Sequence, residues 1–200
     1  MSKQLYKLLA LLTLMLSYSC GSSVLSGQNA SAQASCKYVD IDTLPEKFEL
    51  TVPYVKQDVN YCGPASLSMV MAYYGLTVDQ HDIGKGIVDE DGTSTIDLVN
   101  RAGDYGFNAG MANCEFNSVL SLLSESKPVI LRILNDLGDN AHFIVATGYD
   151  RTQGLLYLND PDRPNRKTET FDHIKSLWNI TTLDPTNNSE NLLILVKPTR

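Results

Sequence analysis

The most informative stretch of the sequence is residues 57–75, which read QDVNYCGPASLSMVMAYYG. From Cys62 onward the spacing of apolar residues predicts a largely buried helix over residues 62–74. Gly75 is a suitable residue to end that helix. Pro64 suits its opening turn, because the N–H group that proline lacks has no partner there. The pattern therefore places Cys62 in the first turn of a buried helix.

A cysteine in this position is a candidate nucleophile. The helix dipole and the free backbone N–H groups favour thiolate over thiol, and the thiolate is the reactive form. Gln57 lies five residues upstream, where its side-chain amide and the backbone N–H of Cys62 could both donate to a developing oxyanion. The non-catalytic alternatives are that Cys62 only packs at the start of a helix and that Gln57 is an ordinary surface glutamine. Spacing alone does not separate them.

A thiolate nucleophile needs a base, and the chain has three histidines. His142 opens a predicted strand directly after a polar loop, which is a common place for catalytic groups. A histidine that only ends a strand is the alternative there. His81 and His173 are expected on the solvent side of helices. His142 is therefore the candidate base.

The orienting group for His142 is expected at the end of the next strand. A pairing of Tyr149 with Gly154, or one shifted by a single residue, brings Asp160 within one residue of His142 across the ladder. Asn159 and Asp160 point to opposite faces, so only one of them can hold the imidazole. A bulge or an odd loop decides which, and both alternatives stay open.

The remaining pattern predicts helices first and strands last. Further helices are expected over residues 78–88, 95–105 with Ser94 as N-cap, 117–124 and 172–178. Strands are expected at residues 128–134, 142–149, 154–159 and 192–196, the second and third forming a hairpin. We therefore predict one α+β domain over residues 38–200, with an N-terminal helical half packed on a C-terminal antiparallel sheet.

The composition of the 200 residues excludes several classes of protein. Apolar residues make up 43% and charged residues 20%, which argues against wholesale disorder, a fibre or a multi-span membrane protein. The net charge is −7 and no basic patch occurs, so no nucleic-acid partner is expected. No motif indicates a metal or nucleotide cofactor, and the four cysteines show no C-x-x-C spacing.

The N-terminus predicts export. Residues 1–20 combine a basic start, a short apolar run and small residues, as in a secretory signal peptide. Cys20, followed by Gly-Ser-Ser, resembles the lipidated cysteine of bacterial lipoproteins, and cleavage after Ala32 or Ala34 is the alternative. Residues 21–37 are expected to be a flexible tether. We therefore expect a cell-envelope protein, lipid-anchored or periplasmic, or an extracellular one, with membrane contact only through the lipid.

The motifs and their order resemble those of the bacteriocin-leader-processing cysteine peptidases, which cut double-glycine leaders. Residues 57–75 resemble the family's nucleophile helix. Residues 141–150, AHFIVATGYD, resemble its histidine strand, and residues 157–161, YLNDP, resemble its orienting strand. The likeness extends over residues 52–198. Because membrane spans and an ATPase are not recognisable here, the chain resembles the stand-alone, exported branch.

The resemblance implies a papain-like fold and assigns the site residues. It makes Cys62 the nucleophile, His142 the base, Asp160 rather than Asn159 the orienting residue, and Gln57 the oxyanion donor. We therefore expect an exported hydrolase that cleaves a peptide or amide bond of a peptide or protein substrate through a Cys62 thioester. The alternatives are a catalytically silent peptide-binding module at the cell surface and a secreted antibacterial or effector toxin.

Cysteine parity adds a hypothesis about disulfide bonding. Once Cys20 is removed or lipidated, Cys36, Cys62 and Cys114 remain. In an oxidising compartment a bond between Cys36 and Cys114 would leave Cys62 as the free thiol that a nucleophile requires. Nothing in the sequence places Cys36 near Cys114.

Overall fold

The computed structural model describes residues 36, 39–135, 137–138, 140–178 and 191–199. The predicted signal peptide, Cys20 and, apart from Cys36, the predicted tether lie outside these residues. In chain order the described elements are η1 (Ile41–Thr43), β1 (Lys47–Glu49), α2 (Cys62–Tyr73), α3 (Gln80–Gly84), α4 (Thr95–Asp104), β2 (Phe107–Asn113), α5 (Phe116–Ser124), β3 (Val129–Leu134), β4 (Ala141–Asp150), β5 (Leu155–Asn159), β6 (Thr168–Thr170), α6 (Phe171–Trp178) and β7 (Leu192–Pro198).

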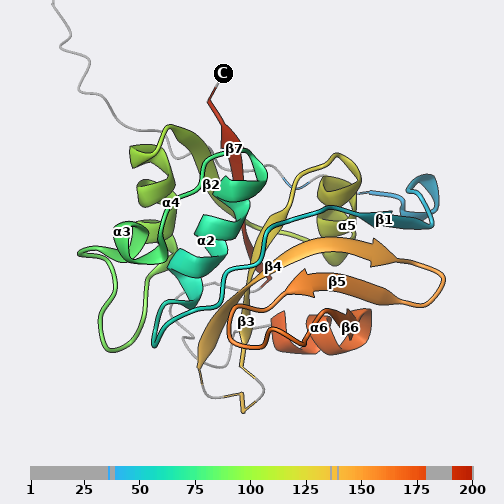
Figure 1. The fold of residues 1–200 in the computed structure, drawn as a ribbon. Coiled ribbons are helices and arrows are strands. Elements are labelled where there is room, and N and C mark those ends of the chain that lie inside the picture. The colour runs from blue at the N-terminus through green and yellow to red at the C-terminus, as the bar shows by residue number, and fades with distance from the viewer. Residues whose placement is uncertain (1–35, 37–38, 136, 139, 179–190, 200) are drawn as a thin grey trace, which may run out of the picture. The chain divides into compact units, whose positions relative to one another are not determined.

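The strands form one antiparallel sheet that helices cover on both faces (Figure 1). Within the described residues, seven strands pair in the order β2-β7-β3-β4-β5-β6, and β1 pairs with β4. Ile144 and Val145 of β4 belong to two different apolar clusters, as alternation along a strand requires. Helices α2, α3 and α4 complete the cluster of Val145, whereas α5 and α6 complete that of Ile144. The helical half expected from the sequence is thus divided between the two faces.

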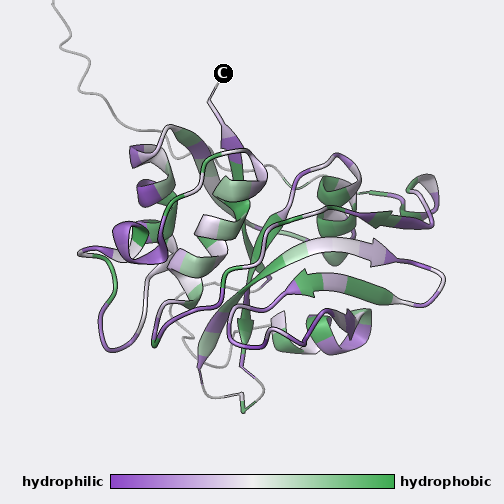
Figure 2. Cartoon of the chain, in the orientation of Figure 1, coloured by the Kyte–Doolittle hydropathy of each residue, from purple (hydrophilic) through white to green (hydrophobic). Residues whose placement is uncertain are grey.

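Helix α2 is the central helix and agrees with its prediction. Its residues from Gly63 to Met71 are all buried, because the helix is apolar around its whole circumference and lies between the sheet, α3 and α4. It begins at Cys62, and Gly75 follows its end with a φ of +92°, a conformation that favours glycine. In Figure 2, apolar residues follow the central strands, and hydrophilic ones gather on α3 and at the turns.

Helix α3 is shorter than predicted. It covers Gln80–Gly84, whereas the pattern predicted a helix over residues 78–88. Asp79 caps its start by accepting a hydrogen bond from the N–H of His81. The chain leaves the helix before Gly86, which has a φ of +74°. Helix α4 matches its prediction, including the N-cap at Ser94.

Strand β2 was absent from the prediction. Its sequence, FNAGMAN, contains no β-branched residue and only one aromatic residue, so the local pattern gives little strand signal. Pairing with β7 along its whole length, Phe107 to Asn113, fixes it as a strand. The strands β1 and β6 were also missed, because each has only three residues and is defined by its pairing, with β4 and β5 respectively.

The β4–β5 hairpin forms as predicted, with a four-residue loop at residues 151–154. Its register differs from the expected one, because Tyr149 pairs with Leu156 and not with Gly154. The carboxylate of Asp150 accepts hydrogen bonds from a hydroxyl, a backbone N–H and a side-chain amide within the loop. These bonds close the turn.

Strand β1 pairs with β4, and the two backbones approach closely at Gly148. Gly148 pairs with Glu49, and a Cβ atom placed on it would lie 2.7 Å from the Glu49 Cα and would also meet the carbonyl oxygen of Phe48. Both obstacles are backbone atoms that cannot swing aside. Only glycine fits this position.

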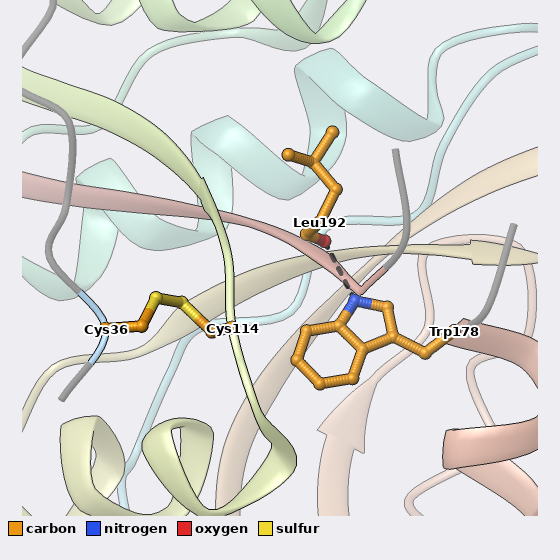
Figure 3. The surroundings of a disulfide bond; sticks show 4 residues. All are labelled: Cys36, Cys114, Trp178 and Leu192. Carbon is orange, nitrogen blue, oxygen red and sulfur yellow. Dashed lines mark hydrogen bonds between the residues drawn. A yellow bond between two sulfur atoms is a disulfide. The ribbon is translucent and has the colours of Figure 1, made fainter. Parts of the chain in front are cut away.

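A disulfide joins Cys36 to Cys114, the residue that follows β2 (Figure 3). The two Cα atoms are 5.3 Å apart. Nearby, the indole N–H of Trp178 donates to the carbonyl of Leu192 at 2.9 Å. The predicted pairing is confirmed, and Cys62 is the free cysteine of the described residues.

Candidate active site

Cys62 is the first residue of α2, at the end where the helix has unbonded N–H groups. The preceding residue, Tyr61, occupies the N-cap position without a side-chain cap, so no capping side chain covers this helix end. Cys62 is half-buried and reduced. Its thiol is therefore placed where the helix dipole favours a negative charge.

His142 is the second residue of β4 and reaches Cys62 from the sheet. Its Nε2 lies 2.8 Å from Oδ1 of Asp160, and its ring also interacts with the Cys62 side chain. Because Asp160 occupies Nε2, the nitrogen left for the thiol is Nδ1. His81 and His173 lie on exposed helix surfaces, as expected, with partners outside this group.

Asp160 is the residue that holds His142, and a β-bulge explains why. The register of β4 and β5 shifts between Ala146 and Gly148, so the last pair of the ladder is Val145 with Asn159. By alternation, Asp160 then shares a face with His142, whereas an unbulged ladder would put Asn159 there. Asn159 instead donates its side-chain amide to the Val52 carbonyl at 3.1 Å.

Buried charges surround Asp160. Only 1% of its side chain is exposed, and its Oδ2 lies 3.2 Å from Nη1 of Arg166. Arg166 is itself 7% exposed and its Nε donates to Glu169 at 2.8 Å. Asp160 also accepts the backbone N–H of Asp162 at 3.0 Å. Each oxygen of the buried carboxylate therefore has a partner, as burial of a charge demands.

These contacts set the protonation states of His142 and Asp160. Burial opposes the charge on His142 and lowers its pKa, but hydrogen bonds to Asp160 and Cys62 outweigh burial and raise the pKa to about 9. Burial likewise raises the pKa of Asp160, but His142, the Asp162 N–H and Arg166 together bring it below its usual value. At neutral pH the site therefore holds an imidazolium against a carboxylate.

Gln57 lies in the segment between β1 and α2. Its backbone N–H donates to the Pro161 carbonyl at 2.9 Å, so the segment of Gln57 runs beside the residues that follow β5. A tight turn with a hydrogen bond from the Tyr61 N–H to the Asp58 carbonyl then leads into α2. The Gln57 side chain is half-buried, and its Oε1 is buried without a hydrogen-bond partner among the described residues. The structure thus brings Cys62, His142 and Asp160 together in one chain of contacts, and a backbone hydrogen bond links Gln57 to the residues that follow Asp160.

Sequence reasoning missed two residues that support this arrangement. Arg166 lies six residues beyond Asp160 in a polar stretch with no periodicity to mark it. The hydroxyl of Tyr54 donates to the carbonyls of Asp160 and Pro161, both at 3.2 Å. The Tyr54 contact joins residues 106 positions apart, and neither contact is marked by the local sequence pattern.

None of the helices among the described residues is both long and apolar enough to cross a bilayer. No group of three or more His, Cys, Asp or Glu among those residues is arranged to hold a metal ion.

Comparison with known proteins adds independent findings. The sequence profile of the Peptidase_C39 like family matches residues 49–183, a range that includes Gln57, Cys62, His142 and Asp160. The transport/processing ATP-binding protein ComA of Streptococcus pneumoniae is 30% identical over 104 residues, which are 50% of this chain and 14% of ComA. The match thus spans only a small part of that relative.

Solved structures share the fold. A C39-like peptidase from Bacillus anthracis superposes with a TM-score of 0.61 at 18% identity, covering 78% of this chain and 100% of that one. The peptidase domain of Streptococcus ComA gives 0.59 at 20% identity, with 76% and 99% covered. A double glycine motif protease from an AMS/PCAT transporter, solved with its leader peptide, gives 0.60 at 22% identity, with 76% and 95% covered. The papain-like α+β fold expected from the sequence is confirmed.

Proposed function

Because the chain belongs to the Peptidase_C39 like family and is a cysteine peptidase-like hydrolase, we propose that it is an exported enzyme that cuts peptide bonds through a thioester on Cys62. The observation that carries the proposal is the chain of contacts from Cys62, at the start of a buried helix, through His142 to Asp160. Such a chain supplies a nucleophile, a proton donor and an orienting group together.

The first half of the proposed reaction forms the thioester. The Cys62 thiolate attacks the peptide carbonyl carbon, and the negative charge moves to the carbonyl oxygen. The side-chain amide of Gln57 and the backbone N–H of Cys62 donate to that oxygen. His142, an imidazolium below a pH of about 9, protonates the leaving amine as the C–N bond breaks.

The second half releases the product. Neutral His142 takes a proton from water, and the hydroxide adds to the thioester carbonyl. The C–S bond then breaks, which gives the carboxylic acid and restores the thiolate beside the imidazolium. Asp160 stays ionised throughout, because Arg166 and the Asp162 N–H bind it in addition to His142.

The proposed substrate is a peptide with a double-glycine site. The chain matches part of ComA, a transport and processing protein, and shares its fold with a double glycine motif protease solved with a leader peptide. These likenesses support a peptide substrate of that type here.

Export is part of the same proposal. The signal-like residues 1–20 and the Cys36–Cys114 disulfide both favour an oxidising compartment. Lipidation of Cys20 is tested by the mass of the mature N-terminus in wild type and in Cys20→Ala. A diacylglycerol-modified Cys20 supports a lipid anchor, whereas an N-terminus beyond residue 20 supports ordinary cleavage.

The activity is tested with the full chain and a panel of peptides of the same length that carry Gly-Gly, Ala-Ala or Leu-Leu at the centre. We expect cleavage after Gly-Gly, loss of cleavage in Cys62→Ala, and a covalent acyl adduct on Cys62 visible by mass spectrometry. The matched control Cys36→Ser/Cys114→Ser removes the other described cysteines and should keep the activity.

Binding of these peptides without turnover by wild type and Cys62→Ala alike would overturn the proposal. It would instead support the silent peptide-binding module. Equal cleavage of all three peptides would overturn only the double-glycine preference.

A further inference from the structure

Gln80, the first residue of α3, forms hydrogen bonds on both sides of Gln57 along the chain. Its Nε2 donates to the carbonyl of Lys56 at 2.9 Å, and its Oε1 accepts the backbone N–H of Asp58 at 3.0 Å. A side-chain amide offers both a donor and an acceptor, so this pair copies the two bonds that a neighbouring strand would make. One side chain thereby fixes both chain neighbours of Gln57.

The backbone of Gln57 is held from the other side as well. Its N–H donates to the carbonyl of Pro161 at 2.9 Å, and the Tyr54 hydroxyl donates to the same carbonyl. In an extended segment, the N–H of one residue and the polar groups of its neighbours point in opposite directions. Gln57 is therefore clamped between Gln80 of α3 and the segment that follows β5.

Regular secondary structure does not hold this segment. Described residues 50–61, between β1 and α2, contain no helix or strand. Another contact from α3, between His81 and Asp58 at 2.8 Å, joins two exposed side chains, with 55% and 63% of them accessible. Exposed ion pairs of this kind hold a loop only weakly. The Gln80 hydrogen bonds are exposed too, but they hold two backbone groups, so the Gln80 amide is the link from α3 that acts on the backbone itself.

Resting on the proposed function, we infer that Gln80 is a positioning residue that holds the Gln57 amide where the oxyanion forms. An oxyanion donor accelerates acyl transfer only when its place is fixed before the reaction. The Gln57 side-chain oxygen makes no hydrogen bond among the described residues, so the position of its amide depends on its backbone. That backbone depends on Gln80.

The test compares two reactions of Cys62 in the full chain. Acylation by the Gly-Gly peptide develops an oxyanion, whereas alkylation by iodoacetamide does not. The variants are Gln80→Leu, which removes both hydrogen bonds, and Gln80→Glu, which keeps only an acceptor. Gln153→Leu is the matched control, because the Gln153 amide bonds Asp150 in the turn of the β4–β5 hairpin.

We expect Gln80→Leu to lower kcat for acylation by about 10-fold to 100-fold, somewhat less than the loss of a whole oxyanion donor. KM and the alkylation rate should stay at the wild-type values, because neither involves the oxyanion. Gln80→Glu should fall between wild type and Gln80→Leu. Adding Gln80→Leu to Gln57→Ala should cause no further loss, since the residue that Gln80 positions is then absent. Gln153→Leu should react like wild type.

Wild-type acylation by a folded Gln80→Leu variant would overturn the inference. Equal losses in acylation and alkylation, or a full multiplicative loss in the double variant, would overturn it too and indicate a general structural role. If Gln80→Leu does not fold, Gln80→Glu decides by the same criteria. If the wild-type chain is not acylated by the Gly-Gly peptide, both the proposed function and this inference are overturned. If wild type is acylated but the Gln80 variants do not behave as expected, only this inference is overturned.

Discussion

The helix side and the sheet side of the site are held in different ways. Cys62 occupies its position because α2 begins there. The residues of α2 are largely apolar, and this local composition is what buries the helix against its neighbours. His142 and Asp160 meet because two strands pair with a bulge and because Arg166 binds the far oxygen of the carboxylate.

This difference has a physical consequence. The proposed nucleophile, at the start of a buried helix, should tolerate changes elsewhere in the sheet, because its position depends on local backbone geometry. The proposed acid–base pair depends on register, and a register error of one residue moves a side chain to the other face. The sheet side should therefore be the more easily broken of the two.

Asp160→Asn is expected to have the largest effect on the sheet side. It removes the charge that holds His142 protonated, so burial should lower the pKa of His142 from about 9 and move the alkaline limb of the acylation profile to lower pH. We also expect kcat to fall at least about 100-fold, because the imidazole loses its orienting anion. The measurement is a pH–rate profile. Asp162→Asn, the exposed neighbour, is the control, and matching profiles for the two variants would contradict the assignment.

Arg166→Met removes the ion pair between Arg166 and Asp160. Removing one partner of a buried ion pair should lower the free energy of unfolding by about 3–5 kcal/mol. Urea denaturation measures the loss. Lys127→Met, which removes the exposed pair with Glu125, should cost about 0–1 kcal/mol. Equal losses in the two variants would show that Arg166 does not stabilise the sheet side.

Gly148→Ala tests the close pairing of β1 with β4 next to the bulge. Its methyl group would meet the backbone of Glu49, and overpacking of this kind should cost about 1–3 kcal/mol. Gly103→Ala is the control in an open position of α4 and should gain about 0.5–1 kcal/mol from helix propensity. Thermal unfolding of both variants gives the comparison. An unchanged melting temperature for Gly148→Ala would mean that β1 can move aside.

Ser66→Ala probes the link between the two sides and should have the smallest effect. The Ser66 hydroxyl of α2 donates to the carbonyl of Phe143, the residue after His142, at 3.3 Å. Losing one buried hydrogen bond should cost about 1 kcal/mol. Ser176→Ala, an exposed hydroxyl in α6, should cost less. A loss above the value for Arg166→Met would reverse the order of the two sides.

How far the sequence predicts each side follows from the same contrast. Local pattern was sufficient for α2, for Cys62 at its start and for the cap at Ser94, because each depends on residues within one or two turns. The choice of Asp160 over Asn159 stayed open on the residues alone, because it depends on a bulge fixed by pairing across the sheet.

The misses have two origins. Strand β2 depends on a partner far along the chain, β7. Arg166 reaches back six residues to Asp160 through an irregular segment that no local pattern marks. Helix α3 was overpredicted because the periodicity continued past the glycines that end it. Long-range pairing therefore explains the missed strand, whereas irregular local backbone explains Arg166 and the end of α3.

The pairing of Cys62 with His142 is the central claim, and its most direct test is the rate at which iodoacetamide labels Cys62 near neutral pH. Wild type is compared with His142→Ala, and the labelled cysteine is identified by mass spectrometry. We predict that Cys62 is labelled faster in wild type than in His142→Ala, because the positive charge of His142 stabilises the negatively charged, reactive form of the cysteine. Identical labelling rates in a folded His142→Ala variant and wild type would contradict the claim.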